Sequence, residues 1–269
     1  MEENNHTVFM AKTLSDVFYH IKTVRPLQIL GGCTRTKLDF DAKALSVRAI
    51  PELKELDKRE RYIDFGPAVT LSEMLSIGRT NMPSVLYDAL SGIATEQIRN
   101  IATLGGNICA QGQKLTLWSP LLALDARIEI KNQTSTKYIP FKNFTKIPEP
   151  FVLTKIRVPI DDWEVAIFRR IGPLSRITPM SAGFTFLVNT EKDIVVNIKI
   201  AFAGMTVFRS REFENKILGS KLPLEDKFIT ELIADASNMS EEGFKTSGAD
   251  PMLKQEFLHL LRYSLEQLT

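Results

Sequence analysis

The sequence has few of the residues that hold metals or form disulfides. Among its 269 residues are two cysteines, Cys33 and Cys109, too few for an iron–sulfur cluster or a closed zinc site unless other residue types contribute. The three histidines, His6, His20 and His259, lie near the chain ends without the spacing of metal ligands. We therefore predict no metal site. A redox pair of the two cysteines is less favoured than two small residues that are buried or tolerated.

The sequence also lacks an excess of charge and any long apolar run. Its 34 basic residues nearly balance 32 acidic ones, for a formal net charge of +2. Binding nucleic acid by neutralising phosphates needs a larger and more clustered positive charge, so we expect no nucleic-acid partner. No apolar run approaches the roughly 20 residues of a membrane span, and the opening stretch MEENNHTVFMAKT lacks the pattern of a signal peptide. We predict a cytoplasmic protein with reduced thiols and no membrane contact.

What is present is typical of a globular protein with several subdomains. Hydrophobic residues make up 44% and charged residues 25% of a chain long enough for two or three subdomains. The periodicity over 13–24 predicts a helix with Thr13 or Ser15 as its cap, followed by a short buried strand over 27–30. Similar patterns predict further strands and helices at 45–50, 51–56, 61–75, 82–94, 117–130 and 151–160.

From residue 163 onward, consecutive strands are followed by helices. The strand patterns lie at 165–172, 181–189 and 193–205, and the helical patterns at 224–238 and 250–268. This order predicts an antiparallel sheet with helices, and an α+β fold for the chain. We place a domain boundary between 1–162 and 163–269, with subdomains of about 1–55 and 56–162 in the first part.

Two stretches with paired glycines stand out, LQILGGCTRTK at 27–37 and TEQIRNIATLGGNICAQGQ at 95–113. Neither matches the dinucleotide fingerprint G-x-G-x-x-G or the phosphate-binding motif G-x-x-x-x-G-K-[ST]. Paired glycines indicate a tight turn, or backbone that must come very close to a ligand. In the second interpretation the N–H groups of both loops hold phosphate oxygens, and Thr34, Thr103 and Asn107 add polar side chains. The residues alone leave both interpretations open.

The second stretch closely resembles the signature loop of the FAD-binding subunits of molybdenum hydroxylases, the xanthine dehydrogenase and carbon monoxide dehydrogenase medium-subunit flavoprotein family. The similarity continues in the same order along nearly the whole chain. It includes LQILGGCTRTK, IPELKEL, YIDFGPAVTLSEML, SPLLALDARIEI, FVLTKIRVP, FRRIG, RSREFENKILG and LKQEFLHLLRYSLEQ. One Gly-Gly loop is weak support, whereas the ordered set is strong.

The resemblance implies a two-subdomain FAD-binding domain of the vanillyl-alcohol-oxidase type, followed by a small C-terminal α+β domain. It also implies an extended FAD between the two N-terminal subdomains, with its pyrophosphate on the two glycine loops. Leu153 is then expected against the isoalloxazine or adenine, and Arg169 near the flavin, although a strand-end charge is an equal alternative for Arg169. The cofactor-binding residues implied are Leu30, Gly31, Gly32, Cys33, Thr34, Arg35, Thr36, Thr103, Gly105, Gly106, Asn107, Thr116, Leu153 and Arg169.

The sequence departs from the family pattern at three places. Thr116 stands where the family commonly has an aspartate that contacts the cofactor. Cys33 and Arg35 replace the more usual threonine and aspartate, and a positive side chain at Arg35 suits a phosphate. The cysteine-rich insertion that holds an extra iron–sulfur cluster in some relatives is absent.

The function implied is that of an FAD-binding subunit in a xanthine dehydrogenase-like oxidoreductase. Electrons would pass from 2Fe–2S clusters on a partner subunit through FAD to NAD+ or another acceptor. A molybdenum-cofactor subunit would hydroxylate the substrate, because no nucleophile and base are paired in this sequence and we predict no catalytic residue in it. Two alternatives stay open: a flavin-free structural subunit of such a complex, and a stand-alone flavin reductase.

Overall fold

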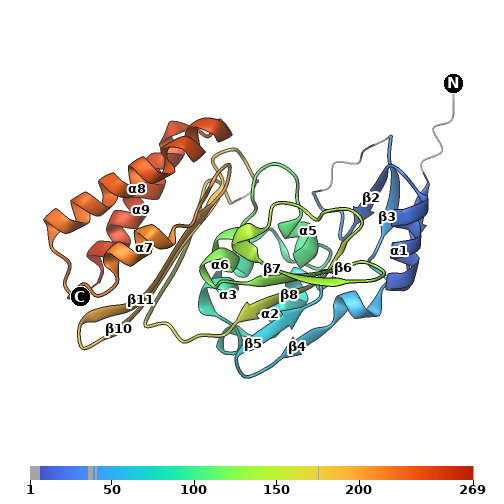
Figure 1. The fold of residues 1–269 in the computed structure, drawn as a ribbon, viewed down its shortest axis with the longest axis horizontal. Helices are drawn as coiled ribbons and strands as arrows, with labels where there is room; N and C mark the ends of the chain where they lie inside the picture. Colours follow the sequence, from blue (N-terminus) through green and yellow to red (C-terminus); the bar gives the residue numbers. More distant parts are fainter. Residues whose placement is uncertain (1–6, 36–38, 40, 175, 269) are drawn as a thin grey trace. The chain divides into compact units, whose positions relative to one another are not determined.

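The computed structural model describes residues 7–35, 39, 41–174 and 176–268 (Figure 1). The chain forms two compact units, each drawn from several segments. Unit 1 comprises Met1–Ile77, Thr95–Ala110 and Asp125–Ile160, and unit 2 comprises Gly78–Ala94, Gln111–Leu124 and Asp161–Thr269. The domain boundary at residue 162, which rests on the change of strand and helix pattern near residue 163, stays a prediction, because compact units and domains along the sequence are different criteria.

Unit 1 begins with a small parallel sheet and one helix (Figure 1). The strand order is β1-β3-β2, with bounds Val8–Met10 for β1, Leu27–Leu30 for β2 and Lys43–Ser46 for β3. Helix α1 spans Leu14–Thr23, and its N-cap Thr13 accepts from the Asp16 backbone N–H while the Asp16 carboxylate accepts from Thr13. The predicted helix is confirmed, with Thr13 as the cap, and so is the strand over 27–30, although only its last residue, Leu30, is buried. The strand expected at 45–50 ends earlier, at Ser46.

A five-stranded antiparallel sheet forms the larger part of unit 1. Its order is β4-β5-β8-β6-β7, with bounds Leu56–Lys58, Tyr62–Phe65, Val152–Pro159, Arg127–Lys131 and Thr136–Pro140. Arg157 of β8 donates two parallel hydrogen bonds to the Asp64 carboxylate of β5. Its Nε lies 2.7 Å from Oδ1, and its Nη2 lies 2.8 Å from Oδ2. This pairing holds the Arg157 pKa above its ordinary value.

The remaining helices of unit 1 are short. They are 3₁₀ helices η1 (Pro51–Lys54) and η3 (Phe141–Asn143), and α-helices α2 (Leu71–Ser76), α4 (Glu96–Arg99) and α5 (Leu104–Ile108). The stretch 95–113, which the sequence presents as one glycine loop, therefore contains two helices. Glycine is a poor helix former, so local propensity did not reveal α5.

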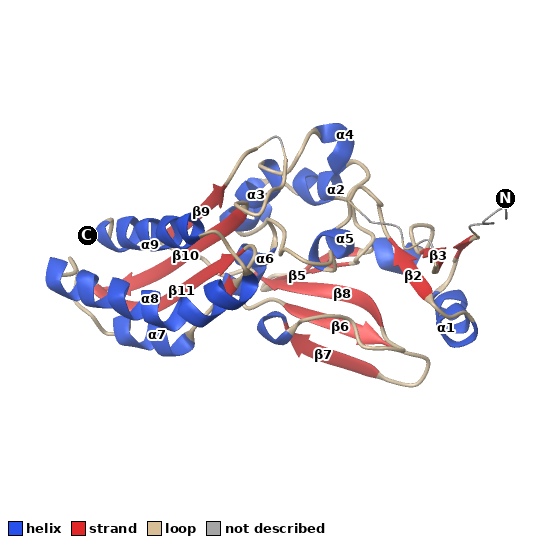
Figure 2. Ribbon diagram, turned by 90° about the horizontal axis from the view of Figure 1, so that it is seen from above, coloured by secondary structure: helices blue, strands red, loops and turns tan. Residues whose placement is uncertain are grey.

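Unit 2 is built on an antiparallel sheet of order β12-β11-β10-β9. The strand bounds are Val165–Ile171 (β9), Ala182–Glu191 (β10), Ile194–Ala203 (β11) and Val207–Phe208 (β12). Helices α7 (Arg211–Ile217), α8 (Asp226–Ser247) and α9 (Pro251–Glu266) lie along one face of it (Figure 2). Their shared core is rich in phenylalanine, including Phe184, Phe202 and Phe257, all fully buried.

The other face of this sheet contacts α6 (Trp118–Ala123), in which every residue is buried. The Thr185 hydroxyl of β10 donates to Ser119 of α6 at 3.0 Å. Unit 2 also contains α3 (Ser84–Ser91) and the 3₁₀ helix η2 (Arg79–Asn81). The α+β prediction is confirmed, while α7 was missed and α8 runs nine residues beyond the helical pattern. None of the described helices has the length and apolar character needed to cross a bilayer.

Candidate functional site

The first glycine loop follows β2 directly and is rich in unused hydrogen-bond donors. Within the described part of the chain, the backbone N–H groups of Gly32, Cys33, Thr34 and Arg35 donate to no acceptor. Cys33 has φ of +56°, in the left-handed region that residues other than glycine seldom occupy. A left-handed residue within such a run lets consecutive N–H groups converge on an anion. The loop therefore has the donors, and Arg35 the positive charge, that a phosphate requires.

The second glycine stretch is the first turn of α5, and its N–H groups are already engaged. Leu104 donates to the Val69 carbonyl at 3.0 Å, and Gly105 donates to the Pro67 carbonyl at 2.8 Å. Gly106 donates to the hydroxyl of the N-cap residue Thr103 at 3.1 Å. Although the sequence suggested phosphate-holding N–H groups in both loops, only the first loop presents a run of free ones.

The two glycine stretches pack directly against each other within unit 1. A Cβ placed on Gly32 would lie 1.9 Å from the Ile101 carbonyl oxygen, and one on Gly31 would lie 2.8 Å from the Thr103 hydroxyl. Gly32 is thus required by the contact between segments about 70 residues apart in sequence, whereas a side chain at Gly31 requires the Thr103 hydroxyl to move. This is a structural reason beside the ligand-binding one.

Gly105 and Gly106 differ in their surroundings: Gly105 packs against the protein, and Gly106 borders open space. A Cβ on Gly105 would meet Pro67 at 2.7 Å, so a side chain there is excluded by the protein itself. Gly106 is exposed, and a Cβ there would meet only the Thr103 hydroxyl, at 3.1 Å. The backbone at Gly106 has no positive φ. Gly106 therefore leaves room beside α5 that a side chain would fill.

Asn107, the next residue of α5, has a buried acceptor without a donor. Its Oδ1 atom is shielded from solvent and has no hydrogen-bond partner among the described residues. A buried unpaired carbonyl oxygen costs about 1–3 kcal/mol, so such atoms usually mark a missing partner. The hydroxyl and amino groups of a flavin dinucleotide supply donors of the kind that is missing. The free N–H groups, the open Gly106 and the unpaired Asn107 together fit FAD.

The other predicted site residues lie elsewhere or outside the described residues. Thr36 lies outside them, and Leu30, at the end of β2, is buried. Leu153 is paired with Ile130 inside the five-stranded sheet and is 6% exposed. Thr116 and Arg169 belong to unit 2.

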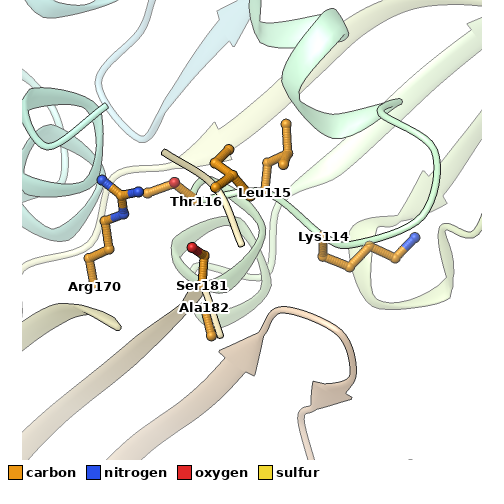
Figure 3. A pocket seen from close by; sticks show the side chains of 7 residues that line it. Lys114, Leu115, Thr116, Arg170, Ser181 and Ala182 are labelled. Carbon is orange, nitrogen blue, oxygen red and sulfur yellow. The ribbon is translucent and has the colours of Figure 1, made fainter. Parts of the chain in front are cut away.

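The two adjacent arginines of β9 point to opposite faces of the unit 2 sheet. Arg169 is exposed and lines an open hollow of about 350 Å³ with Glu256 and Leu260 of α9, and Arg170 also borders this hollow. Arg170 lines a small cavity on the other side with Thr116, Ser181 and four further residues (Figure 3). Strand alternation separates neighbouring side chains in this way, so the sequence could not tell which arginine shares surroundings with Thr116.

Sequence reasoning missed the carbonyl groups of Pro67 and Val69 and the capping role of Thr103. The Thr103 cap has a recognisable signal, a threonine three residues before Gly106, whereas the Pro67 and Val69 contacts have none. Both cysteines are free and exposed, so neither is a buried small residue. In the described part of the chain, no three His, Cys, Asp or Glu side chains gather where they could hold a metal ion.

Comparison with known proteins places this geometry in a family. Residues 4–161 match the family model described as the FAD binding domain in molybdopterin dehydrogenase. The xanthine dehydrogenase FAD-binding subunit of Escherichia coli O157:H7 is 30% identical over 193 residues, which cover 68% of this chain and 63% of that protein. The chain thus matches somewhat less than two thirds of the length of this relative.

Solved structures show that the fold is shared over a greater length. Carbon monoxide dehydrogenase from Oligotropha carboxidovorans contains a chain with a TM-score of 0.80 and 15% identity, and the match covers 100% of this chain and 97% of that one. Quinoline 2-oxidoreductase from Pseudomonas putida 86 gives a TM-score of 0.77 and 14% identity, with 100% and 96% covered. The family match covers more than half of the chain and agrees with the site geometry. The chain belongs to the family of FAD-binding domains of molybdopterin dehydrogenases, and its cofactor is FAD.

Proposed function

We propose that the chain is the FAD-carrying subunit of a xanthine dehydrogenase-like molybdenum hydroxylase. The observation that carries this proposal is the run of free N–H groups at Gly32–Arg35, in a loop whose glycines pack against residues 101–103 just before α5. When bound, FAD supplies the redox chemistry between a one-electron donor and a two-electron acceptor, and the protein supplies binding and orientation.

Each residue of the two glycine stretches has a distinct proposed role. The N–H groups of the first loop hold the pyrophosphate, and Arg35 adds positive charge. Because Gly106 has no side chain, it leaves room beside α5 for the cofactor. Asn107 accepts a hydrogen bond from the cofactor, and the Thr103 hydroxyl, which accepts from Gly106, still has a proton to donate.

The other assignments rest on the family resemblance. We propose Leu30, Thr36, Thr116, Leu153 and Arg169 as further cofactor contacts, and 1–162 and 163–269 as the family's two domains. The family match over 4–161 supports that boundary.

The proposed partners are a subunit with 2Fe–2S clusters and a subunit with the molybdenum cofactor, and the proposed acceptor is NAD+ or another oxidant. The name of the Escherichia coli relative supports this assignment. We also propose that the complex works in the cytoplasm, where two exposed free thiols stay reduced.

Replacing Gly106 by Val tests the cofactor role of this site. The new side chain fills the open space beside α5, so we expect the purified variant to lose its flavin absorption while circular dichroism shows an unchanged fold. Gly92→Val is the matched control, because a Cβ at Gly92 would make only ordinary contacts, the nearest at 3.6 Å. Normal FAD content in the Gly106 variant would overturn the loop assignment.

A further inference from the structure

Arg170 of unit 2 is a half-buried cation that pairs with no carboxylate among the residues that the structure describes. Its Nη1 donates to the carbonyl of Gly92 at 3.2 Å and of Leu174 at 3.3 Å, and its Nη2 donates to the carbonyl of Pro173 at 2.9 Å. These bonds tie β9 to the end of α3 and to the loop after β9. Partial burial lowers the pKa of Arg170, which reflects the cost of keeping the charge there.

One edge of the Arg170 guanidinium has no acceptor. Its Nε–H and the second N–H of Nη2 donate to no described residue. The same edge of the guanidinium, a fork formed by Nε and Nη2, donates to the carboxylate of Asp64 in the Arg157 pair of unit 1. Such a fork binds anions with two parallel, charge-assisted hydrogen bonds. In Arg157 this edge is occupied by a carboxylate, whereas in Arg170 it has no acceptor among the described residues.

The open fork borders a small cavity lined by hydroxyl groups and no acid. The lining residues are Lys114, Leu115, Thr116, Arg170, Ile177, Ser181 and Ala182. The Thr116 hydroxyl has no partner among the described residues. The Ser181 hydroxyl accepts from the Thr178 N–H at 3.0 Å and lies 3.5 Å from the Thr178 hydroxyl, a long contact in which either group can donate. Figure 3 shows Arg170 and Thr116 extending toward one another while Lys114 points away, its ammonium lying 4.1 Å from the centre of the Trp118 ring.

We propose that this cavity binds one small monovalent anion, of the size of chloride, between the Arg170 fork and the hydroxyls of Thr116 and Ser181. The cavity volume of about 10 Å³ holds a single water-sized particle and excludes a phosphate or a dinucleotide. The anion neutralises the half-buried guanidinium and fastens the 114–116 segment to the loop between β9 and β10. This inference does not rest on the first glycine loop of unit 1, but it shares Thr116 with the cofactor contacts proposed from the family resemblance.

Bromide is the probe for this site, because it replaces chloride and is visible by anomalous X-ray scattering. In crystals of the full chain grown with sodium bromide, we expect an anomalous peak within hydrogen-bonding reach of Arg170 Nε. In solution, chloride should raise the thermal midpoint at constant ionic strength, through mass action on the folded state. A water molecule or an atom of the cofactor at the fork in place of the halide overturns the proposal.

Three variants separate the anion site from general effects of charge. Arg170→Gln should lose the bromide peak. Thr116→Asp keeps every Arg170 bond to a carbonyl and places a carboxylate at the fork, so it should also lose the peak and make the midpoint insensitive to chloride. Arg169→Gln removes an equal charge from the opposite face of the same strand and should keep both signals. If Thr116→Asp retains the bromide peak, or if Arg169→Gln loses it, the site is wrongly placed.

Discussion

The two Gly-Gly stretches of unit 1 look alike in sequence but differ in their hydrogen-bond donors. In the first loop, four consecutive backbone N–H groups from Gly32 onward have no acceptor among the described residues. In the second, the N–H groups of Leu104, Gly105 and Gly106 already donate to the protein. We therefore expect the first loop to supply the donors for an anion, and the second to shape the space beside it.

This difference also changes the meaning of each glycine. Gly32 and Gly105 lie against backbone or proline of the same unit, so their substitution disturbs folding first. Gly106 lies next to open space, so its substitution disturbs the ligand first. A repeated motif is thus a poor guide to a repeated role, and variants at the two stretches should separate stability from cofactor binding.

The largest effect is expected from Gly32→Ala. The methyl group would lie 1.9 Å from the Ile101 carbonyl oxygen, so the two stretches must move apart. We expect a loss of about 3 kcal/mol or more in the free energy of unfolding, the upper range for overpacking. Urea unfolding measures it. Gly31→Ala is the milder comparison, since its methyl group would approach a side-chain hydroxyl, that of Thr103 at 2.8 Å, rather than backbone, and equal losses in the two variants would contradict this difference.

Asn107→Leu should act on stability and on binding with opposite signs. The variant removes a buried oxygen that has no donor, so the chain without flavin should gain about 1 kcal/mol of stability. It also removes the proposed bond to the cofactor, so FAD should bind about tenfold more weakly. Thermal unfolding and fluorescence titration with FAD measure the two effects. A variant that loses both stability and affinity would mean that Asn107 supports the fold alone.

Arg35→Glu tests the electrostatic part of the first loop. Reversing an exposed charge beside the pyrophosphate should weaken FAD binding about tenfold at low ionic strength, and the difference should shrink as salt screens it. FAD titrations at low and high sodium chloride measure this. Arg48→Glu changes another exposed arginine of unit 1 and should leave the affinity unchanged. Equal weakening in both variants would reflect net charge rather than position.

The smallest effect is expected from Cys33→Gly. Glycine adopts the φ of +56° found at Cys33 without steric cost, but it also makes the unfolded chain more flexible. These contributions oppose each other, so stability should change by less than about 1 kcal/mol, and FAD content should stay normal. Cys33→Val should be the less stable of the two, because a branched side chain disfavours positive φ. Loss of flavin in the glycine variant would show that the thiol itself is a contact.

Local patterns predicted much of this fold because short-range chemistry determines those parts. The Thr13 cap and the apolar spacing of Val17 and Ile21 define α1, and alternation of apolar residues defines the strands of unit 2. Helix α5 was not predictable in this way, since its glycines disfavour a helix and its stability comes from the Thr103 cap and from contacts with Pro67.

The chemistry of the site was only partly readable from sequence. The glycine pairs and Asn107 marked the segments that we propose contact the cofactor. The free donors of the first loop and the engaged donors of the second depend on contacts between segments far apart in the chain. Likewise, which of Arg169 and Arg170 faces Thr116 depends on the pairing of β9 with β10, which sequence alone does not give.

The discontinuous make-up of the two units has a consequence for synthesis. Helix α6, whose six residues are all buried, leaves the ribosome well before β10 and β11, the strands it packs against. Translation adds about 5–20 residues per second, so α6 is synthesised several seconds before its partner strands. A chain cut at residue 162 would leave Trp118 and Leu121 without them permanently. The nascent protein therefore passes through an aggregation-prone interval in which a chaperone has a defined segment to hold, and fragments for expression should keep residues 78–124 together with the C-terminal sheet.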